Sequence, residues 1–475
     1  MQKIIGRKEE IKHLNQYYKS DKSEFIAIYG RRRVGKTFLV DMCFGQKYDF
    51  YVSGTIEGTM NDQLFNFNAS LRKYGDAQTP VAKDWRQAFE ALAALLEGKK
   101  KKGRMLIFID ELPCFDTPRS GFVKAFDYFW NTWASKRQNI MLIVCGSATS
   151  WMVDNLIDSH GGLHNRITKE MHLKPFCLQE TEEYLKAAGI NWPRLTLAQC
   201  YMVMGGIPYY LSLLDKTESL STNIDRLFFA RDGELRREYD RLFYALFRKP
   251  EKYMAVIKQL AKSRKGLSRQ EIIARNKLTS GEDLTKILRN LEYCDFLRSY
   301  SANGDASSVN NKIYQITDQY TLFYLKFCER ATTDENWWSH NLGTSQQNDW
   351  WGIMFEILCI FHIQQIKVAL GISGIYTEYA GWRSKGDDKV QIDLIIDRAD
   401  DIVNLCEMKY SKTDYTLTKS EAEKLVRRQS VFEQERKKAK GVQMVLITTK
   451  GLKHGKHSGI ISRVVTLDDL FQSPT

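Results

Sequence analysis

The chain has 475 residues, more than one hydrophobic core usually organises, so we expect about two to four domains. It carries 70 Lys and Arg against 57 Asp and Glu, a net charge of +13. This balance favours polyanionic partners, although a merely basic cytoplasmic protein would show it equally. No apolar run approaches the ~18 residues that cross a bilayer, and the N-terminus lacks the apolar stretch of a secretory signal. The sequence therefore argues against a membrane span and indicates the cytoplasm.

The nine cysteines are scattered, odd in number and never arranged as CxxC. Most of them lie in apolar stretches, which is typical of reduced core residues. We therefore expect free thiols and no zinc site. The cysteines stand at positions 43, 114, 145, 177, 200, 294, 328, 359 and 406.

The first part of the chain alternates short apolar runs with helix-length amphipathic stretches. The runs lie at 25–29, 47–54, 105–110 and 141–146. This rhythm predicts a parallel α/β sheet that is buried on both faces, in a domain of residues 1–175. The strands then stop, and the pattern predicts an all-helical lid over 176–248.

Residues 249–330 predict three helices followed by two strands that flank a Gly-, Asn- and Ser-rich tip. This is the order of a winged helix-turn-helix. Its third helix, at 280–297, would enter a DNA major groove with Thr285, Lys286 and Arg289 on its polar side. The early acids Glu282 and Asp283 would face phosphates unfavourably, so a winged helix used only for protein packing stays open. Non-specific phosphate contacts would come from Lys262, Arg264, Lys265 and Arg269.

A second α/β domain is predicted over 345–475, after a connector at 330–350. A long helix starts at about Trp350. Strands are expected at 375–379, 391–396, 402–408 and 443–448, with a charged helix at 418–438 before the last of them.

The segment from Gly30 to Thr37 matches the pattern GxxxxGK[ST] between a predicted strand and a predicted helix. In this motif the backbone N–H groups curl around phosphates, while Lys36 meets the β and γ oxygens and the Thr37 hydroxyl holds Mg²⁺. The sequence thus predicts a P-loop that binds ATP with Mg²⁺. The residues expected to contact the nucleotide are Gly30, Arg31, Arg32, Arg33, Val34, Gly35, Lys36, Thr37 and Phe38.

Asp110 and Glu111 end the apolar run at 105–110, where ligands bind open α/β sheets. Asp110 would orient Mg²⁺ and its waters, and Glu111 would polarise the attacking water. Ser147 ends the next strand, where it would sense the γ-phosphate or would instead cap the following helix. Arg166 is either an arginine finger, acting within the chain or from a neighbouring subunit, or a surface residue.

These motifs, with the opening IIGRKEEIKHL and the later Gly-Gly-Ile-Pro at 205–208, resemble archaeal-type ATPases of the AAA+/STAND group, which are found in archaea and bacteria. The resemblance covers essentially the whole chain, because such proteins continue into a winged helix and a domain similar to PD-(D/E)XK nucleases. It implies that Ile5, Gly6 and Arg7 lie near the adenine and that the segment ending at Pro208 approaches the nucleotide. A sensor arginine of the usual AAA+ lid is not evident.

A carboxylate cluster is predicted in the last domain. Asp393 lies on one predicted strand, and Glu407 and Lys409 lie on the next, two residues apart and therefore on one face. Glu356 stands within an otherwise apolar helix. Asp393, Glu407 and the carbonyl of Met408 would hold Mg²⁺, and Lys409 would hold or deprotonate a water for phosphodiester hydrolysis. The order resembles the PD-(D/E)XK fold, with Ile392 in place of the proline.

A second ExK at Glu435 lies in a plain charged helix, so ExK alone is weak evidence. We expect an ATP-driven switch that controls a winged helix and a nuclease-like domain acting on double-stranded DNA, as a monomer or homo-oligomer. Two alternatives stay open. One is a regulatory scaffold with an inactive nuclease fold, and the other is a DNA-binding regulator without cleavage.

Overall fold

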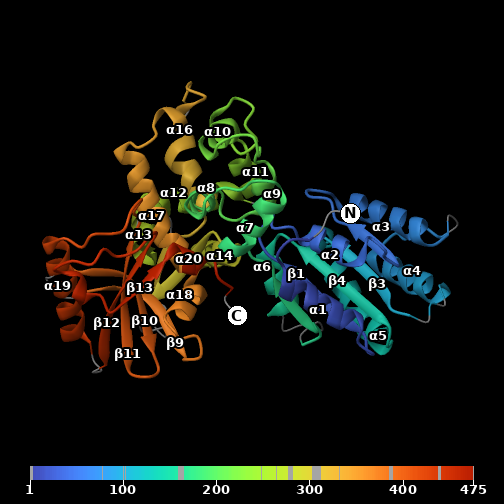
Figure 1. Ribbon diagram of the computed structural model, residues 1–475. Coiled ribbons are helices and arrows are strands. Elements are labelled where there is room, and N and C mark those ends of the chain that lie inside the picture. The colour runs from blue at the N-terminus through green and yellow to red at the C-terminus, as the bar shows by residue number, and fades with distance from the viewer. Residues whose placement is uncertain are drawn as a thin grey trace. The chain divides into compact units, whose positions relative to one another are not determined.

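The chain folds into two compact units, drawn in Figure 1. Unit 1 comprises Met1–Pro175, Arg241–Pro250 and Arg289–Asp295, and unit 2 comprises Phe176–Asp240, Glu251–Leu288 and Phe296–Thr475. The computed structural model describes residues 4–76, 79–99, 101, 103–158, 165–247, 249–263, 265–276, 282–301, 312–330, 332–384, 389–436 and 440–473. The predicted tip of the wing at 302–311, the start of the third helix at 280–281, and Arg264 lie outside these residues.

Unit 1 is built on a parallel five-stranded sheet in the order β2-β3-β4-β1-β5. The sequence predicted an α/β fold with such a sheet, and this is confirmed. The first four strands are close to the predicted runs, whereas β5 was missed. The strands are β1 (Glu24–Tyr29), β2 (Phe50–Ser53), β3 (Met105–Asp110), β4 (Ile140–Gly146) and β5 (Lys169–His172).

In the described part of residues 1–175, six α-helices accompany this sheet. Two of them begin at side-chain caps, because Thr59 forms a capping box with Asp62, and Asp84 accepts a hydrogen bond from the backbone of Gln87. The helices are α1 (Lys8–Tyr18), α2 (Lys36–Phe44), α3 (Met60–Tyr74), α4 (Trp85–Gly98), α5 (Phe122–Thr132) and α6 (Thr149–Met152).

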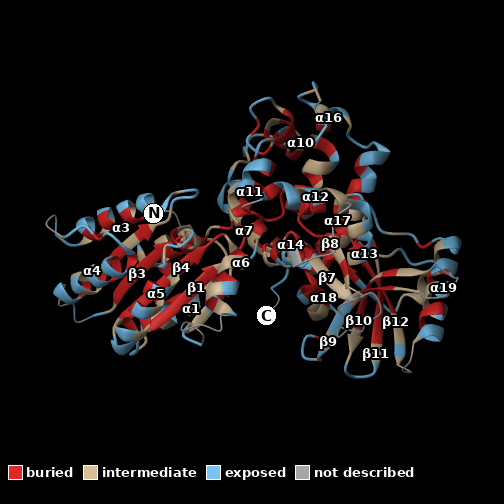
Figure 2. Cartoon of the chain, turned by 180° about the vertical axis from the view of Figure 1, so that it is seen from behind, coloured by how far each residue is buried: buried red, intermediate tan, exposed pale blue. Residues whose placement is uncertain are grey.

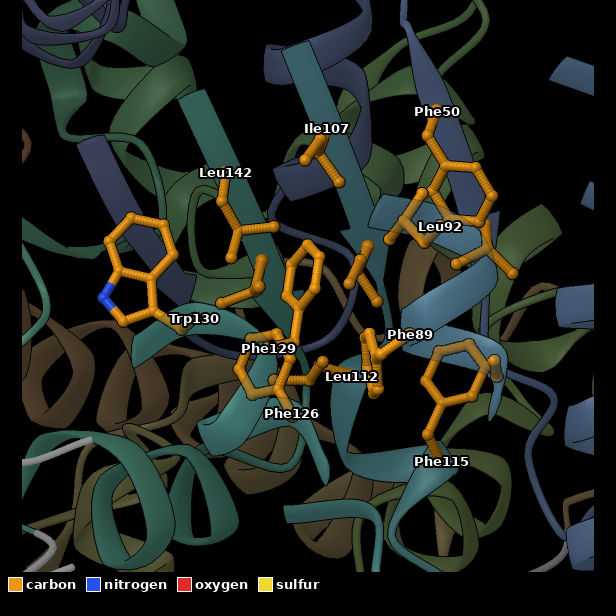
Figure 3. Packing of buried hydrophobic residues seen from close by; sticks show 14 of the residues in the cluster. Phe50, Phe89, Leu92, Ile107, Leu112, Phe115, Phe126, Phe129, Trp130 and Leu142 are labelled. Carbon is orange, nitrogen blue, oxygen red and sulfur yellow. The ribbon is translucent and has the colours of Figure 1, made fainter. Parts of the chain in front are cut away.

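The core of unit 1 is rich in aromatic rings (Figure 3). Phe126 and Trp130 of α5 pack on Phe25 of β1, with ring centroids 5.7 and 4.9 Å away, and Phe89 of α4 stacks on Phe129. Strands β3 and β4 are buried at every position, as Figure 2 shows in red. This burial fixes the strand ends that carry the candidate site.

The described chain between residues 178 and 246 forms helices with irregular connections, as the sequence predicted. Its helices are α7 (Leu178–Ala187), α8 (Arg194–Met204), α9 (Pro208–Ser212), α10 (Leu220–Ile224) and α11 (Glu238–Leu246).

The described residues between 249 and 316 form three helices and a small antiparallel sheet in the order β6-β8-β7. The third helix, α14 (Glu282–Tyr293), ends four residues before the predicted end at 297, because Asp295 takes a left-handed conformation and β7 begins at Leu297. The other elements are α12 (Pro250–Ala261), β6 (Leu267–Ser268), α13 (Arg269–Asn276), β7 (Leu297–Ser301) and β8 (Lys312–Ile316).

The segment predicted as a connector at 330–350 is partly helical. It contains α16 (Trp337–His340) and the start of α17 (Ser345–Phe361), and the buried ring of Trp338 explains why the segment is ordered. Before it come α15 (Gln319–Phe323) and the π-helical turn η6 (Tyr324–Cys328).

The C-terminal sheet has the order β13-β12-β11-β10-β9. The pairs β9–β10 and β10–β11 are antiparallel, whereas β11–β12 and β12–β13 are parallel. The sheet and its helices comprise α18 (Ile363–Ala369), β9 (Thr377–Arg383), β10 (Gln391–Arg398), β11 (Ile402–Lys409), α19 (Lys419–Glu435), β12 (Gly441–Thr448), β13 (Arg463–Thr466) and α20 (Leu467–Leu470).

Within the described ranges, no single helix is long and apolar enough to cross a bilayer. Only α17 and α18 taken together, bent by 76° against each other, have the length and composition of a span.

His362 lies at the bend between these two helices and is buried. Its Nε2 accepts a hydrogen bond from the backbone N–H of Leu178 at 2.9 Å, and its Nδ1 lies 2.8 Å from the carbonyl of Leu358. Burial lowers the pKa of His362 to about 4. The ring is therefore neutral in the folded protein, with its proton on Nδ1.

Acid is expected to destabilise the fold through this ring. Because the pKa of His362 is lower in the folded state than the ordinary 6.5, its contribution to stability is lost as the pH falls below 6.5. Between pH 7 and pH 5 the loss is about 2 kcal/mol. Thermal unfolding at both pH values measures it, and His362→Gln should show a smaller change in midpoint. An equal change in the variant would contradict the assignment.

Candidate nucleotide site and C-terminal carboxylate cluster

The sheet order of unit 1 brings three strand ends together. All five strands are parallel, so their carboxyl ends lie along one edge, and β4 lies between β1 and β3. The loop from Gly30 to Lys36 follows β1, Ser147 follows β4, and Asp110 ends β3. The residue after β4 is thus placed between the other two groups.

The loop after β1 needs glycine at Gly30. Its φ is +142°, and an added Cβ would lie 2.4 Å from the carbonyl oxygen of Leu173. Gly35, with φ +88°, precedes the first residue of α2. The loop therefore reaches a helix N-terminus in the conformation that a phosphate-binding loop requires.

Lys36 is buried, with a relative exposure of 6%. Its Nζ donates to the carbonyls of Gly30 and Arg31 at 2.9 and 3.1 Å and to Ser147 Oγ at 3.1 Å. Burial lowers the pKa of Lys36, and the nearby carboxylates, chiefly Glu111, act in the opposite direction. The ammonium is thus held at the strand ends by hydrogen bonds.

Thr37 and Asp110 form the second contact across the sheet edge. Thr37 Oγ1 donates to Asp110 Oδ2 at 2.8 Å. Burial and then the charge of Glu111 raise the pKa of Asp110 to about 6, although the hydrogen bonds from Thr37 and from the backbone of Glu111 oppose this. A hydroxyl and a carboxylate at this distance are the oxygen donors that Mg²⁺ prefers.

Glu111 has a left-handed backbone, with φ 47° and ψ 47°. Its carboxylate accepts two hydrogen bonds from Ser147, one from the backbone N–H at 3.0 Å and one from the hydroxyl at 2.5 Å. Ser147 therefore joins Lys36 to Glu111. Its side chain does not cap α6, whose N-cap residue is Ala148, so the capping alternative is wrong.

The other residues predicted to contact the nucleotide or its phosphates differ in exposure and in position along the chain. Arg7 Nη2 donates to the carbonyl of Val34 at 3.2 Å, which ties the N-terminal segment to the loop. Phe38, near the start of α2, is 42% exposed. Arg166 is exposed in the segment before β5. Pro208 begins α9 in unit 2, so its approach to the nucleotide stays a prediction.

A chain of contacts that begins at the residue before the loop was not predicted from the sequence. Tyr29, the last residue of β1, stacks on His172 with ring centroids 5.0 Å apart, and His172 Nε2 lies 2.9 Å from Asp295. All three belong to unit 1. The position of Tyr29 just before the loop was the only available signal, because β5, which carries His172, was not predicted.

One predicted DNA-reading side chain is engaged inside unit 1. Arg289 forms an ion pair with Asp154 at 3.0 Å. To contact a DNA base, Arg289 would therefore have to break its ion pair with Asp154 and bind the edge of the base instead.

In the C-terminal sheet, Asp393 lies on β10, and Glu407 and Lys409 lie on β11. Leu394 pairs with Cys406 in antiparallel register, which places Asp393 and Glu407 at adjoining positions across the two strands. Glu356 is half-buried on α17, and α17 packs on β11. The fold therefore brings the predicted elements together.

The carboxylate of Glu407 forms ion pairs with two cationic side chains. Lys409 Nζ lies 2.8 Å from Oε1, and Arg428 Nη1, from α19, lies 2.5 Å from Oε2. Asp393 accepts from Gln391 Nε2 at 3.0 Å. In the part of the chain that the structure describes, no group of three or more His, Cys, Asp or Glu side chains is arranged to hold a metal ion.

The cysteines form no disulfide. All nine carry free thiols, and five of them are buried.

Comparison with known proteins bears on the first of these two sites. Residues 4–214 match the family described as an ATPase domain predominantly from Archaea. Uncharacterized protein MJECL04 of Methanocaldococcus jannaschii is 26% identical over 398 residues, which are 82% of this chain and 84% of that protein. The uncharacterized ATP-binding protein MJ0423 of the same organism is 47% identical over 37 residues, which are 8% of this chain and 63% of that protein.

Among solved structures, the Walker-type ATPase PABY2304 of Pyrococcus abyssi covers 68% of this chain and 96% of its own, with 18% identity and a TM-score of 0.45. The family match confirms the predicted resemblance to archaeal-type ATPases over residues 4–214.

Proposed function

We propose that the protein is an AAA+/STAND-like switch that binds and hydrolyses ATP with Mg²⁺. The observation that carries this proposal is the linkage of Lys36, Ser147 and Glu111 beside the contact between Thr37 and Asp110. These are the residue types that phosphoryl transfer to water requires, at the end of a sheet where ligands bind.

Each group has a distinct role in the proposed reaction. Lys36 and the loop N–H groups hold the phosphates, while Thr37 and Asp110 would hold Mg²⁺, which when bound offsets the phosphate charge. Glu111 orients the attacking water and accepts its proton. Ser147 positions Glu111 through two hydrogen bonds, so the carboxylate that acts as the base is oriented before the substrate binds.

We further propose that residues 249–330 are a winged helix and that residues 345–475 are a nuclease-like domain acting on DNA. The order of three helices and a hairpin supports the first part. The adjoining positions of Asp393 and Glu407, with Lys409 on the same strand, support the second. Lys265 and Arg269 would contribute phosphate contacts.

A second candidate function is a nucleotide-dependent scaffold with an inactive nuclease fold. The observation that favours it is the double ion pair of Glu407 with Lys409 and Arg428. A guanidinium that occupies a carboxylate oxygen competes with a metal ion for the same lone pairs. Cleavage would then require Arg428 to leave Glu407.

A cleavage assay separates the two candidates. The full chain is incubated with linear, nicked and supercoiled DNA, with Mg²⁺ or Mn²⁺, with and without ATP. A nuclease is expected to cut at least one form, and Asp393→Asn should abolish the cut because an amide is a much weaker metal ligand. Glu423→Gln, an exposed position on α19, is the matched control. If ATP is hydrolysed and no DNA form is cut, the scaffold is supported.

The ATPase part has its own measurement. Purified protein should release phosphate from ATP only with a divalent metal. Absence of both ATP binding and turnover in the folded chain would overturn this part, whatever the outcome with DNA.

A further inference from the structure

Unit 2 contains a cavity of about 830 Å³ that none of the functions above uses. It is lined by the end of α12, by η6 and by α17. Binding sites for small molecules typically measure about 300–1,000 Å³ and combine an apolar floor with a few charged groups. The cavity has the size and composition of such a site.

Aromatic rings form part of the cavity wall. Phe327 contacts Trp350 with ring centroids 5.3 Å apart and Trp337 with centroids 5.5 Å apart. Because each ring is held by its neighbours, the wall is preformed. Trp337 is only half-buried, and one face of its ring stacks on Phe229 with centroids 5.4 Å apart. A planar partner would therefore meet the remaining part of the ring.

The charged groups of the cavity are mostly cations. Lys258 is paired with Glu329 at 2.7 Å. Within the described ranges, Lys262, Lys326 and Arg330 form no ion pair, and each of them is exposed. Asp349 is the other carboxylate in the lining, so positive charge is in excess. The cavity is therefore expected to prefer an anionic ligand.

We propose that this cavity binds a nucleoside phosphate, with the base against Trp337 and the phosphate beside Lys326 and Arg330. The chemistry that combines a planar ring with an anion is shared by a free nucleotide and by the terminal nucleotide of a single strand. This second nucleotide site is distinct from the P-loop, because all of its residues belong to unit 2.

The experiment weakens the first nucleotide site before it tests the second. In the Lys36→Met background, calorimetric titration with AMP, adenosine, inorganic phosphate and a single-stranded hexanucleotide measures binding. AMP or the hexamer is expected to bind, with adenosine and phosphate each at least about tenfold weaker, which corresponds to ~1.4 kcal/mol. AMP binding identifies a free nucleotide as the ligand, and binding of the hexamer alone identifies a strand end.

Charge reversal locates the site. Lys326→Glu with Arg330→Glu should weaken binding at least about tenfold, whereas Lys450→Glu, an exposed position in the same unit, should not. Trp337→Leu should weaken AMP more than phosphate. Thermal unfolding confirms that each variant is folded. Lack of binding by both AMP and the hexamer, or unchanged affinity in the folded double variant, overturns the proposal.

Discussion

Replacement of Lys36 by methionine is expected to reduce ATP turnover by about 10²- to 10³-fold and to weaken nucleotide binding. The ammonium is buried at the strand ends, and it is the group that would meet the β and γ oxygens. Methionine keeps the aliphatic stem of the side chain and removes only its charge and its donors. Phosphate release and nucleotide titration measure the two effects.

The matched control is Lys124→Met, an exposed lysine on α5 of the same unit. It should leave turnover unchanged. The thermal midpoint of Lys36→Met should remain close to that of the unaltered protein. The variant loses three hydrogen bonds, but it no longer has to bury a charged group, and the two effects on the free energy of unfolding offset each other. Turnover at the original rate in the folded variant would rule out the assignment of this loop.

Replacement of Glu111 by glutamine is expected to slow hydrolysis by about 10²- to 10⁴-fold while ATP still binds. An amide cannot accept the proton of the attacking water. Its oxygen can still accept a hydrogen bond from the backbone N–H of Ser147, so the loop geometry should survive. Single-turnover hydrolysis together with equilibrium binding of ATP separates the two steps.

Glu90→Gln, an exposed glutamate on α4, serves as the control for this substitution. The expected pattern is a variant that holds ATP without releasing phosphate. If Glu111→Gln loses binding and hydrolysis together, the role of Glu111 is structural and the proposed base lies elsewhere.

The strands of unit 1 were largely predictable from the sequence, because fully buried parallel strands appear as continuous apolar runs. Strand β5 was missed for a physical reason. It is four residues long, only Met171 is buried, and its pairing with β1 depends on the folded sheet. Strands β9 to β12 of the C-terminal sheet lie close to the predicted runs, whereas the short strand β13 was missed.

The site was predictable where its chemistry is local. Lys36, Thr37, Asp110 and Glu111 follow from spacing and from their places at strand ends. The position of Ser147 between Lys36 and Glu111 was not predictable. It depends on β4 lying between β1 and β3, and the order of strands in a sheet cannot be inferred from the sequence of a single segment.

Arg428 illustrates the same limit in the other unit. It lies 21 residues after Glu407 on a helix whose charges resemble any solvated face. Only the packing of α19 against the sheet brings its guanidinium to the carboxylate. Its contact with Glu407 could not be read from the sequence.

The three hydrogen bonds of Lys36 have a consequence for affinity. An ammonium has three protons, and all of them are already donated to protein oxygens. An arriving phosphate must therefore take over at least one of these donors, and binding is an exchange of acceptors. The exchange favours a charged oxygen over a neutral carbonyl or hydroxyl, since a phosphate oxygen adds the attraction between opposite charges to the hydrogen bond. The loop should therefore discriminate against uncharged ligands, because only an anion attracts the ammonium more strongly than the protein oxygens that it already contacts.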